Sequence, residues 1–149
     1  HAVEWVLARF GPFDRFLSLP PTAPLRCVTD VESALAALDD RSDFVVTMAR
    51  SVRNPWFNMV QDTSEGLRTV LDAGERGISR RQDAPTVYDL TTVAYVTRPE
   101  FILENKCYWD GRVTGVEIPI ERAVDIDSQL DLDFAEFLMA RDEKEGFDA

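Results

Sequence analysis

A continuous apolar run, DFVVTMA at residues 43–49, constrains the fold most, because it shows no polar alternation. A short run of this kind is typical of a strand covered on both faces. Before it, residues 31–38 place apolar side chains at helical spacing, and residues 13–19 form a short aromatic stretch that Pro20 ends. Strand, helix and strand in this order predict an α/β fold with a mostly parallel, twisted sheet and flanking helices.

The remaining elements are predicted from local patterns. Thr29 begins a capping-box signature ahead of the helix expected at residues 31–38. Residues 90–97 and 112–119 are rich in β-branched residues and predict strands, and Pro99 suits the first turn of a short helix. Ser128 is expected to cap the last helix. The apolar stripe of that helix comprises Leu130, Phe134, Phe137 and Leu138.

The chain has 149 residues, which suits one domain with a real core. It contains no repeat, low-complexity tract or linker, so we expect a single α/β domain over residues 1–149. The middle is polar and irregular, most clearly at residues 75–89, where we expect an arm or loop. The first residues, HAVEWVLARF, read as a helix already under way, and we expect the chain to be the rear part of a longer protein.

Charge and composition argue against several kinds of partner. The formal net charge of −11 would repel a phosphate backbone, and no cluster of Lys and Arg reverses it locally. There is no run of apolar residues long enough to cross a bilayer, and no secretion signal. Cys27 and Cys107 match neither a CxxC nor a zinc pattern. We therefore expect a cytoplasmic protein with reduced thiols and without a nucleic-acid or membrane partner.

Regularly spaced acids just before the last helix are the main candidate for chemistry. In the stretch VDID, Asp125 and Asp127 alternate with apolar residues, so an extended segment would project both to one side, about 6.5 to 7 Å apart at Cα. Two such carboxylates can converge on a hard cation such as Mg²⁺. Acids also gather at helix N-termini for reasons of the helix dipole, and Asp131 and Asp133 read as the wet face of the helix. From the residues alone both interpretations stay open.

Other candidate chemistries are less specific. The only histidine is His1, so a Ser/His/Asp or Cys/His system has no base. Arg80 and Arg81 could clamp a carboxylate or phosphate, or form an ordinary solvated pair. Tyr108 and Trp109 could stack on a sugar or cover the edge of a core.

Five blocks of the sequence, taken in order, resemble the C-terminal two thirds of an acylneuraminate cytidylyltransferase, also called a CMP-sialic acid or CMP-nonulosonic acid synthetase. The PTAPLR and VDID signatures are the most specific parts of this resemblance. The blocks cover nearly the whole chain and comprise residues 14–35, 53–60, 80–105, 107–113 and 120–138.

The resemblance implies a nucleotidyltransferase whose fold resembles nucleotide-diphospho-sugar transferases. Its reaction joins CTP to an acidic nine-carbon sugar with Mg²⁺, giving the CMP-sugar and pyrophosphate. It implies a homodimer with a protruding dimerisation and sugar-binding arm at about residues 52–104. It also implies that this chain lacks the N-terminal segment that cradles CTP in the family.

The resemblance also assigns residues. It implies that Asp125 and Asp127 are catalytic and bind the metal, and that Arg81 is catalytic and meets the anionic sugar. Arg26 closes the PTAPLR loop and is implied to bind substrate. The aromatic positions that it places near the sugar are Tyr95, Tyr108 and Trp109.

Two departures from the family pattern concern the sugar. Pro20 stands where members often carry glutamine, and Phe57 where they often carry lysine, so the resemblance points away from N-acetylneuraminate and toward a legionaminic- or pseudaminic-type acid. Two alternatives remain: a non-catalytic truncated homologue that serves as a binding or assembly module, and a cytidylyltransferase for another acidic sugar such as Kdo.

Overall fold

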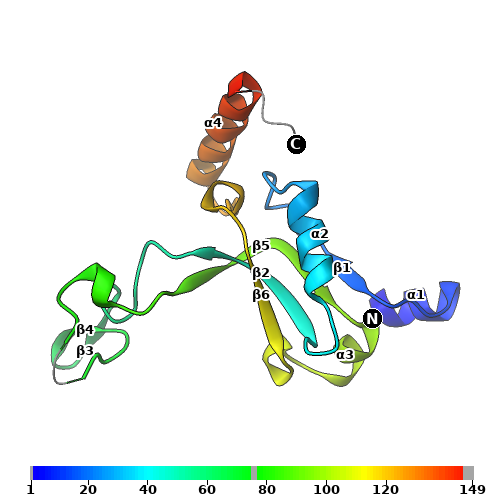
Figure 1. Ribbon diagram of the computed structural model, residues 1–149, viewed down its shortest axis with the longest axis horizontal. Helices are drawn as coiled ribbons and strands as arrows, with labels where there is room; N and C mark the ends of the chain where they lie inside the picture. Colours follow the sequence, from blue (N-terminus) through cyan, green and yellow to red (C-terminus); the bar gives the residue numbers. More distant parts are fainter. Residues whose placement is uncertain (1, 75–76, 146–149) are drawn as a thin grey trace. The chain divides into compact units, whose positions relative to one another are not determined.

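The computed structural model describes residues 2–74 and 77–145 (Figure 1). It divides into two compact units. The first, called the sheet unit, contains the residues up to Ala49 and those from Leu90 onward, and the second, called the hairpin unit, contains Arg50–Asp89. Each unit is described by itself below.

A four-stranded sheet forms the centre of the sheet unit, in the order β1-β5-β2-β6. These strands are β1 (Phe16–Ser18), β2 (Phe44–Arg50), β5 (Tyr88–Thr97) and β6 (Val113–Glu117). β2 and β6 pair in parallel, whereas β1 and β5 pair antiparallel. The sheet is therefore mixed, and the prediction of a mostly parallel sheet is confirmed only for the β2–β6 pair. The reason is that β5 lies between β1 and β2, so the predicted strand–helix–strand unit does not place its two strands side by side.

Four α-helices accompany the sheet among the described residues: α1 (Ala2–Phe10), α2 (Val28–Ala37), α3 (Pro99–Glu104) and α4 (Gln129–Glu145). α3 begins at a proline, as predicted. The predicted cap of α2 at Thr29 is wrong, because the N-cap residue is Cys27, whose backbone N–H donates to the Asp30 carboxylate over 3.1 Å. None of the helices in residues 2–74 and 77–145 is long and apolar enough to span a bilayer.

Two apolar clusters form the core of the sheet unit. The first joins α2 to the sheet through Ala34, Leu38, Val45, Ala94 and Val96. The second holds the loop at 20–26 and the end of β6 against β5. Its buried members are Ala23, Val93 and Ile118.

Only part of the predicted stripe of α4 is buried. Leu138 is 4% exposed and lies on the same buried face of α4 as Ala135, whereas Leu130, Phe134 and Phe137 are exposed. The pattern of apolar residues identified the helix correctly, but α4 buries a neighbouring face.

The hairpin unit contains β3 (Val60–Thr63) and β4 (Gly66–Thr69), which pair antiparallel. Gly66 has φ of 99°, which favours glycine at the end of the tight turn. Asn54 is buried and organises the start of the unit: its side-chain amide donates to Pro85 O over 2.8 Å, and its Oδ1 accepts from Trp56 N. This unit lies within residues 52–104 except at its first two positions; its part in dimerisation stays a prediction.

Candidate functional site

The loop at 20–26 lies against the acidic segment in the sheet unit. Ile126 N donates to Thr22 O over 2.9 Å, which joins the two sequence signatures directly. Arg26 folds back on its own loop: Nε donates to Ala23 O over 2.9 Å, and Nη2 donates to Pro20 O. Arg26 therefore shapes the loop, and a contact between Arg26 and substrate stays a prediction.

The acidic segment itself has no regular secondary structure between a 3₁₀ turn, η3 (Ile120–Arg122), and α4. Asp125 is half-buried, and its Oδ1 is buried without a hydrogen-bond partner within the part of the chain that the structure describes. Asp127 is exposed. An orphaned buried carboxylate oxygen is costly unless something satisfies it, so Asp125 fits a cation ligand.

Asp131 has a different role from these two acids. Its Oδ2 accepts hydrogen bonds from Ser128 Oγ, Ser128 N and Asp127 N, over 2.7, 2.8 and 3.2 Å. The Ser128 hydroxyl and backbone donors hold the pKa of the Asp131 carboxyl below its usual value. Asp131 thus fixes the first turn of α4, a role that its interpretation as part of the wet face of the helix did not include. The Ser128 hydroxyl donates to Asp131, whereas the hydroxyl of a conventional cap accepts from the helix backbone.

The three aromatic candidates lie in one cluster around Phe44. The rings of Tyr95 and Tyr108 lie 6.3 and 5.4 Å from that of Phe44, and the ring of Trp109 lies 4.9 Å from that of Tyr108. Trp109 is 61% exposed. Burial raises the pKa of Tyr95, and the charges of Tyr108 and Asp125 add to the rise, so Asp125 lies within electrostatic range of this cluster. The sequence reasoning missed Phe44, which belongs to the predicted strand at 43–49.

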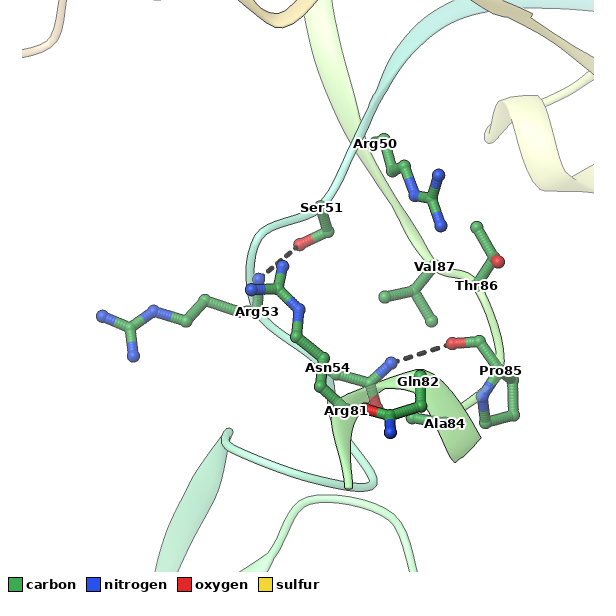
Figure 2. A pocket seen from close by; sticks show the side chains of 10 residues that line it. All are labelled: Arg50, Ser51, Arg53, Asn54, Arg81, Gln82, Ala84, Pro85, Thr86 and Val87. Atoms are coloured by element: carbon green, nitrogen blue, oxygen red, sulfur yellow. Dashed lines mark hydrogen bonds between the residues drawn. The ribbon is translucent and has the colours of Figure 1, made fainter. Parts of the chain in front are cut away.

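Arg81 lies in the hairpin unit, at the start of η1 (Arg81–Asp83) and beside a cavity of about 450 Å³. Arg50 and Arg53 also line this cavity, and in Figure 2 the side chain of Arg53 extends away from those of Arg50 and Arg81. No acidic side chain is among the lining residues that the structure describes. A cavity that is lined by arginines and by no acidic side chain is suited to an anion. The sequence reasoning missed Arg50 and Arg53 as candidates: no motif marks Arg50, and Arg53 begins the resembling block at 53–60 but was given no role there.

A buried ion pair, also missed, links α2 to the residues that precede the acidic segment. Arg122 donates through Nε and Nη2 to the two carboxylate oxygens of Asp30, over 2.8 and 2.7 Å. Burial alone would raise the pKa of Asp30, but hydrogen bonds from Arg122 and Cys27 outweigh it, and the pKa is lowered. The sequence signal that could have found Asp30 was its position in the first turn of a helix.

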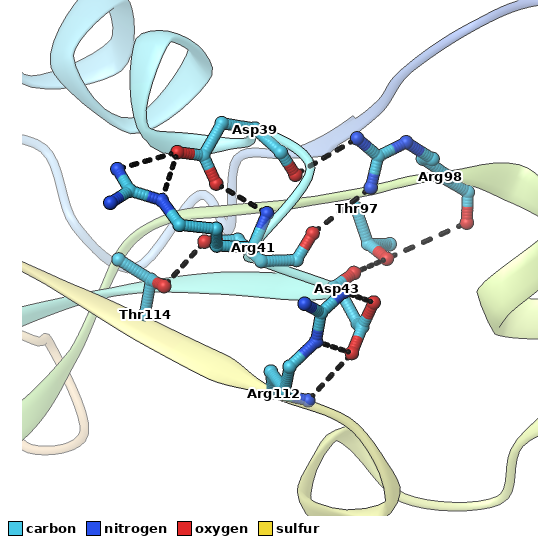
Figure 3. A network of polar contacts seen from close by, with 8 residues as sticks. Asp39, Arg41, Asp43, Thr97, Arg98, Arg112 and Thr114 are labelled. Atoms are coloured by element: carbon cyan, nitrogen blue, oxygen red, sulfur yellow. Dashed lines mark hydrogen bonds and ion pairs between the residues drawn. The ribbon is translucent and has the colours of Figure 1, made fainter.

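A second polar network contains none of the candidate residues and joins the strands of the sheet. Figure 3 shows Asp43, at the start of β2, bound by Arg112 through Nε and Nη2 over 2.9 and 2.8 Å. Thr97 Oγ1 donates to Asp43 O, and Arg98 donates to Ser42 O and Asp39 O. The Arg112 guanidinium holds the pKa of Asp43 well below its usual range. The network joins the start of β2 to the start of β6 and the end of β5.

Comparison with known proteins confirms the resemblance to the CMP-nonulosonic acid synthetase class. No family model matches the chain. Post-translational flagellin modification protein B of Campylobacter coli is 32% identical over 129 residues, 85% of this chain and 53% of that protein. CMP-N,N'-diacetyllegionaminic acid synthase of Campylobacter jejuni subsp. jejuni serotype O:2 is 34% identical over 97 residues, 64% of this chain and 40% of that protein. The matches thus span about half the length of these relatives or less.

Proposed function

We propose that the protein carrying this chain is a cytidylyltransferase that joins CTP to a nonulosonic acid and releases pyrophosphate. The observation that carries the proposal is the buried Oδ1 of Asp125, which has no partner among the described residues, in the VDID signature. The relative whose name states synthesis of a CMP-nonulosonic acid supports the same reaction.

The acidic segment would hold Mg²⁺ through Asp125 and Asp127. Mg²⁺ usually keeps several waters and is held by one or two carboxylates together with substrate phosphates, so two aspartates would suffice. When bound, Mg²⁺ would neutralise charge that develops on the phosphates of CTP. The two aspartates would hold this cation beside the α-phosphate, which the anomeric hydroxyl of the sugar attacks.

The remaining candidates would bind the sugar. Tyr95, Tyr108 and Trp109 offer aromatic faces, of which that of Trp109 is open to solvent. Arg81, with Arg50, offers a cationic cavity for the carboxylate that every nonulosonic acid carries. In a homodimer built through the region at 52–104, this cavity would serve the site of the partner subunit.

The sugar would be of the legionaminic type. Pro20 and Phe57 replace polar side chains that the resemblance associates with N-acetylneuraminate, so these positions offer less hydrogen bonding and more apolar surface. The name of the relative from C. jejuni points to the same class of sugar.

The test is an assay of the full-length protein with CTP, Mg²⁺ and a panel of acids: N,N'-diacetyllegionaminic, pseudaminic, N-acetylneuraminic and Kdo. Formation of the CMP-sugar is followed by mass spectrometry, and pyrophosphate is measured separately. We expect turnover with the nonulosonic acids, lost in Asp125→Asn and retained in Asp133→Asn, whose carboxylate lies exposed on α4. Turnover with Kdo alone, or with none of the acids, would refute the proposal.

A further inference from the structure

The ion pair between Asp30 and Arg122 joins segments that are 92 residues apart in the sequence. Asp30 is 3% exposed, and the side chain of Arg122 is 35% exposed. The guanidinium contacts both carboxylate oxygens, over 2.8 and 2.7 Å. A two-point contact of this kind fixes orientation as well as distance, which an ammonium group cannot do.

Besides Arg122, a small number of contacts hold the segment that follows it, and Ala123 packs against the buried cluster of Ala23, Val93 and Ile118. The segment is irregular, so no ladder of backbone hydrogen bonds holds it. Ile126 N donates to Thr22 O over 2.9 Å, and Asp127 N donates to Asp131 Oδ2 over 3.2 Å at the beginning of α4. Arg122 and Ala123 thus anchor the segment on the side that precedes Asp125.

The chemistry of the ion pair is better suited to fixing the position of Arg122 than to stabilising the fold. Desolvation of two ions offsets much of their attraction, so an apolar pair of similar volume would often stabilise a core as well. Asp30 also accepts from Cys27 N over 3.1 Å and from Cys27 Sγ over 3.2 Å. With these donors and the guanidinium, the Asp30 carboxylate is fixed at the start of α2 and holds Arg122 in one position.

We propose that Asp30 and Arg122 are positioning residues, which set where Asp125 and Asp127 lie relative to the loop at 20–26 and thereby set the affinity of the acidic segment for a divalent cation. The inference rests on the proposed function, in which these two aspartates hold the cation. Neither Asp30 nor Arg122 contacts the cation itself.

The test variant is Arg122→Lys, which keeps the charge and removes the two-point contact. Mn²⁺ binding to the full-length protein is measured by calorimetry without substrates, and the Mg²⁺ dependence of CMP-sugar formation is measured separately. Changes to residues that orient metal ligands typically weaken metal affinity by about 10- to 100-fold, and we expect a rise of this size in both cation constants. KM for CTP at saturating Mg²⁺ should change little.

The matched control is Arg112→Lys, which removes the same contact from Asp43 in the structural network and should leave cation affinity unchanged. Equal weakening by both lysine variants would overturn the inference, because a general loss of stability would explain it. Wild-type cation constants in Arg122→Lys, with Mn²⁺ binding lost in Asp125→Asn, would overturn the inference and leave the proposed function intact.

Absence of CMP-sugar formation by the wild type would refute the proposed function, but Mn²⁺ calorimetry would still decide the inference. In this calorimetry, weaker Mn²⁺ binding in Arg122→Lys but not in Arg112→Lys supports the inference. Absence of Mn²⁺ binding by the wild type overturns the inference. If Arg122→Lys does not fold, Asp30→Asn/Arg122→Met removes both charges, leaves no unpaired buried ion and carries the same expectations.

Discussion

Replacing Asp125 by alanine should stabilise the protein when no divalent cation is present. A buried polar atom without a partner costs about 1 to 3 kcal/mol, and Oδ1 of Asp125 is such an atom in residues 2–74 and 77–145. Alanine cannot reproduce the van der Waals attraction of the carboxyl group for its neighbours, which offsets part of this gain, so we expect a net gain of about 1 kcal/mol. For a protein of about 150 to 250 residues, this corresponds to a rise in Tm of about 2 to 4 °C.

The assay is thermal unfolding of the full-length protein, first with a chelator and then with Mg²⁺ in excess. A cation that binds only the folded state should raise the Tm of the wild type and leave that of Asp125→Ala unchanged. Asp133→Ala is the control, because its exposed side chain bonds to Gln129 on the same helix, and its change in stability should stay within about 0.5 kcal/mol. A wild type more stable than Asp125→Ala in the chelator would refute the reasoning from the orphaned oxygen.

Three further outcomes are expected. Asp127→Asn should lower turnover by orders of magnitude with an unchanged fold, and steady-state kinetics across a Mg²⁺ titration would contradict the metal assignment if turnover stayed near wild type. Arg81→Ala should raise KM for the sugar by about ten- to a hundredfold, the equivalent of about 1.5 to 3 kcal/mol, and KM for CTP much less; an equal rise in both would remove Arg81 from the sugar site. Because the pKa of Asp43 is lowered in the folded protein, its pairing with Arg112 contributes stability that is fully present above the ordinary carboxyl pKa of about 3.9 and is lost as the pH falls below it. Urea unfolding at a series of pH values should therefore show that Asp43→Asn is less stable at neutral pH and loses less stability on acidification, and parallel curves for the two proteins would contradict this.

The strands were predictable because their signal is local. Residues 43–49 and 90–97 are β-branched or apolar runs, and in β2 and β5 most of their side chains are buried, as such runs require. The order of the strands was not predictable in this way. It depends on β5 pairing with β1 on one side and lying beside β2 on the other, and neither contact leaves a mark in a single segment.

The cap of α2 shows why a correct helix can begin at a different residue from the one expected. Thr29 has the preferred chemistry for an N-cap, but Asp30 lies where its carboxylate can accept from the Cys27 backbone and also bind Arg122. A contact with a residue so far along the chain outweighed the local preference. The same limit applies to Phe44, whose aromatic neighbours come from β5, α3 and η2 (Tyr108–Asp110).

The candidate residues were predictable to different degrees. From spacing alone, a metal site at Asp125 and Asp127 was one of two interpretations, and the family resemblance favoured the metal site. The fold then supplied what spacing could not, namely a buried oxygen on Asp125 and a link from Ile126 to the loop at 20–26. Arg50 and Arg53 became candidates only because they line the same cavity as Arg81.

The loop at 20–26 has few backbone N–H donors, and the side chain of Arg26 supplies hydrogen bonds in their place. Proline has no N–H, so Pro20, Pro21 and Pro24 leave the loop with few backbone donors for its own carbonyls. Arg26 supplies two of the missing donors from its side chain, to Pro20 O and Ala23 O. Fixed φ angles and a guanidinium bound across the turn leave little conformational entropy for this loop to lose when a ligand arrives, so more of each contact that it makes is retained as affinity.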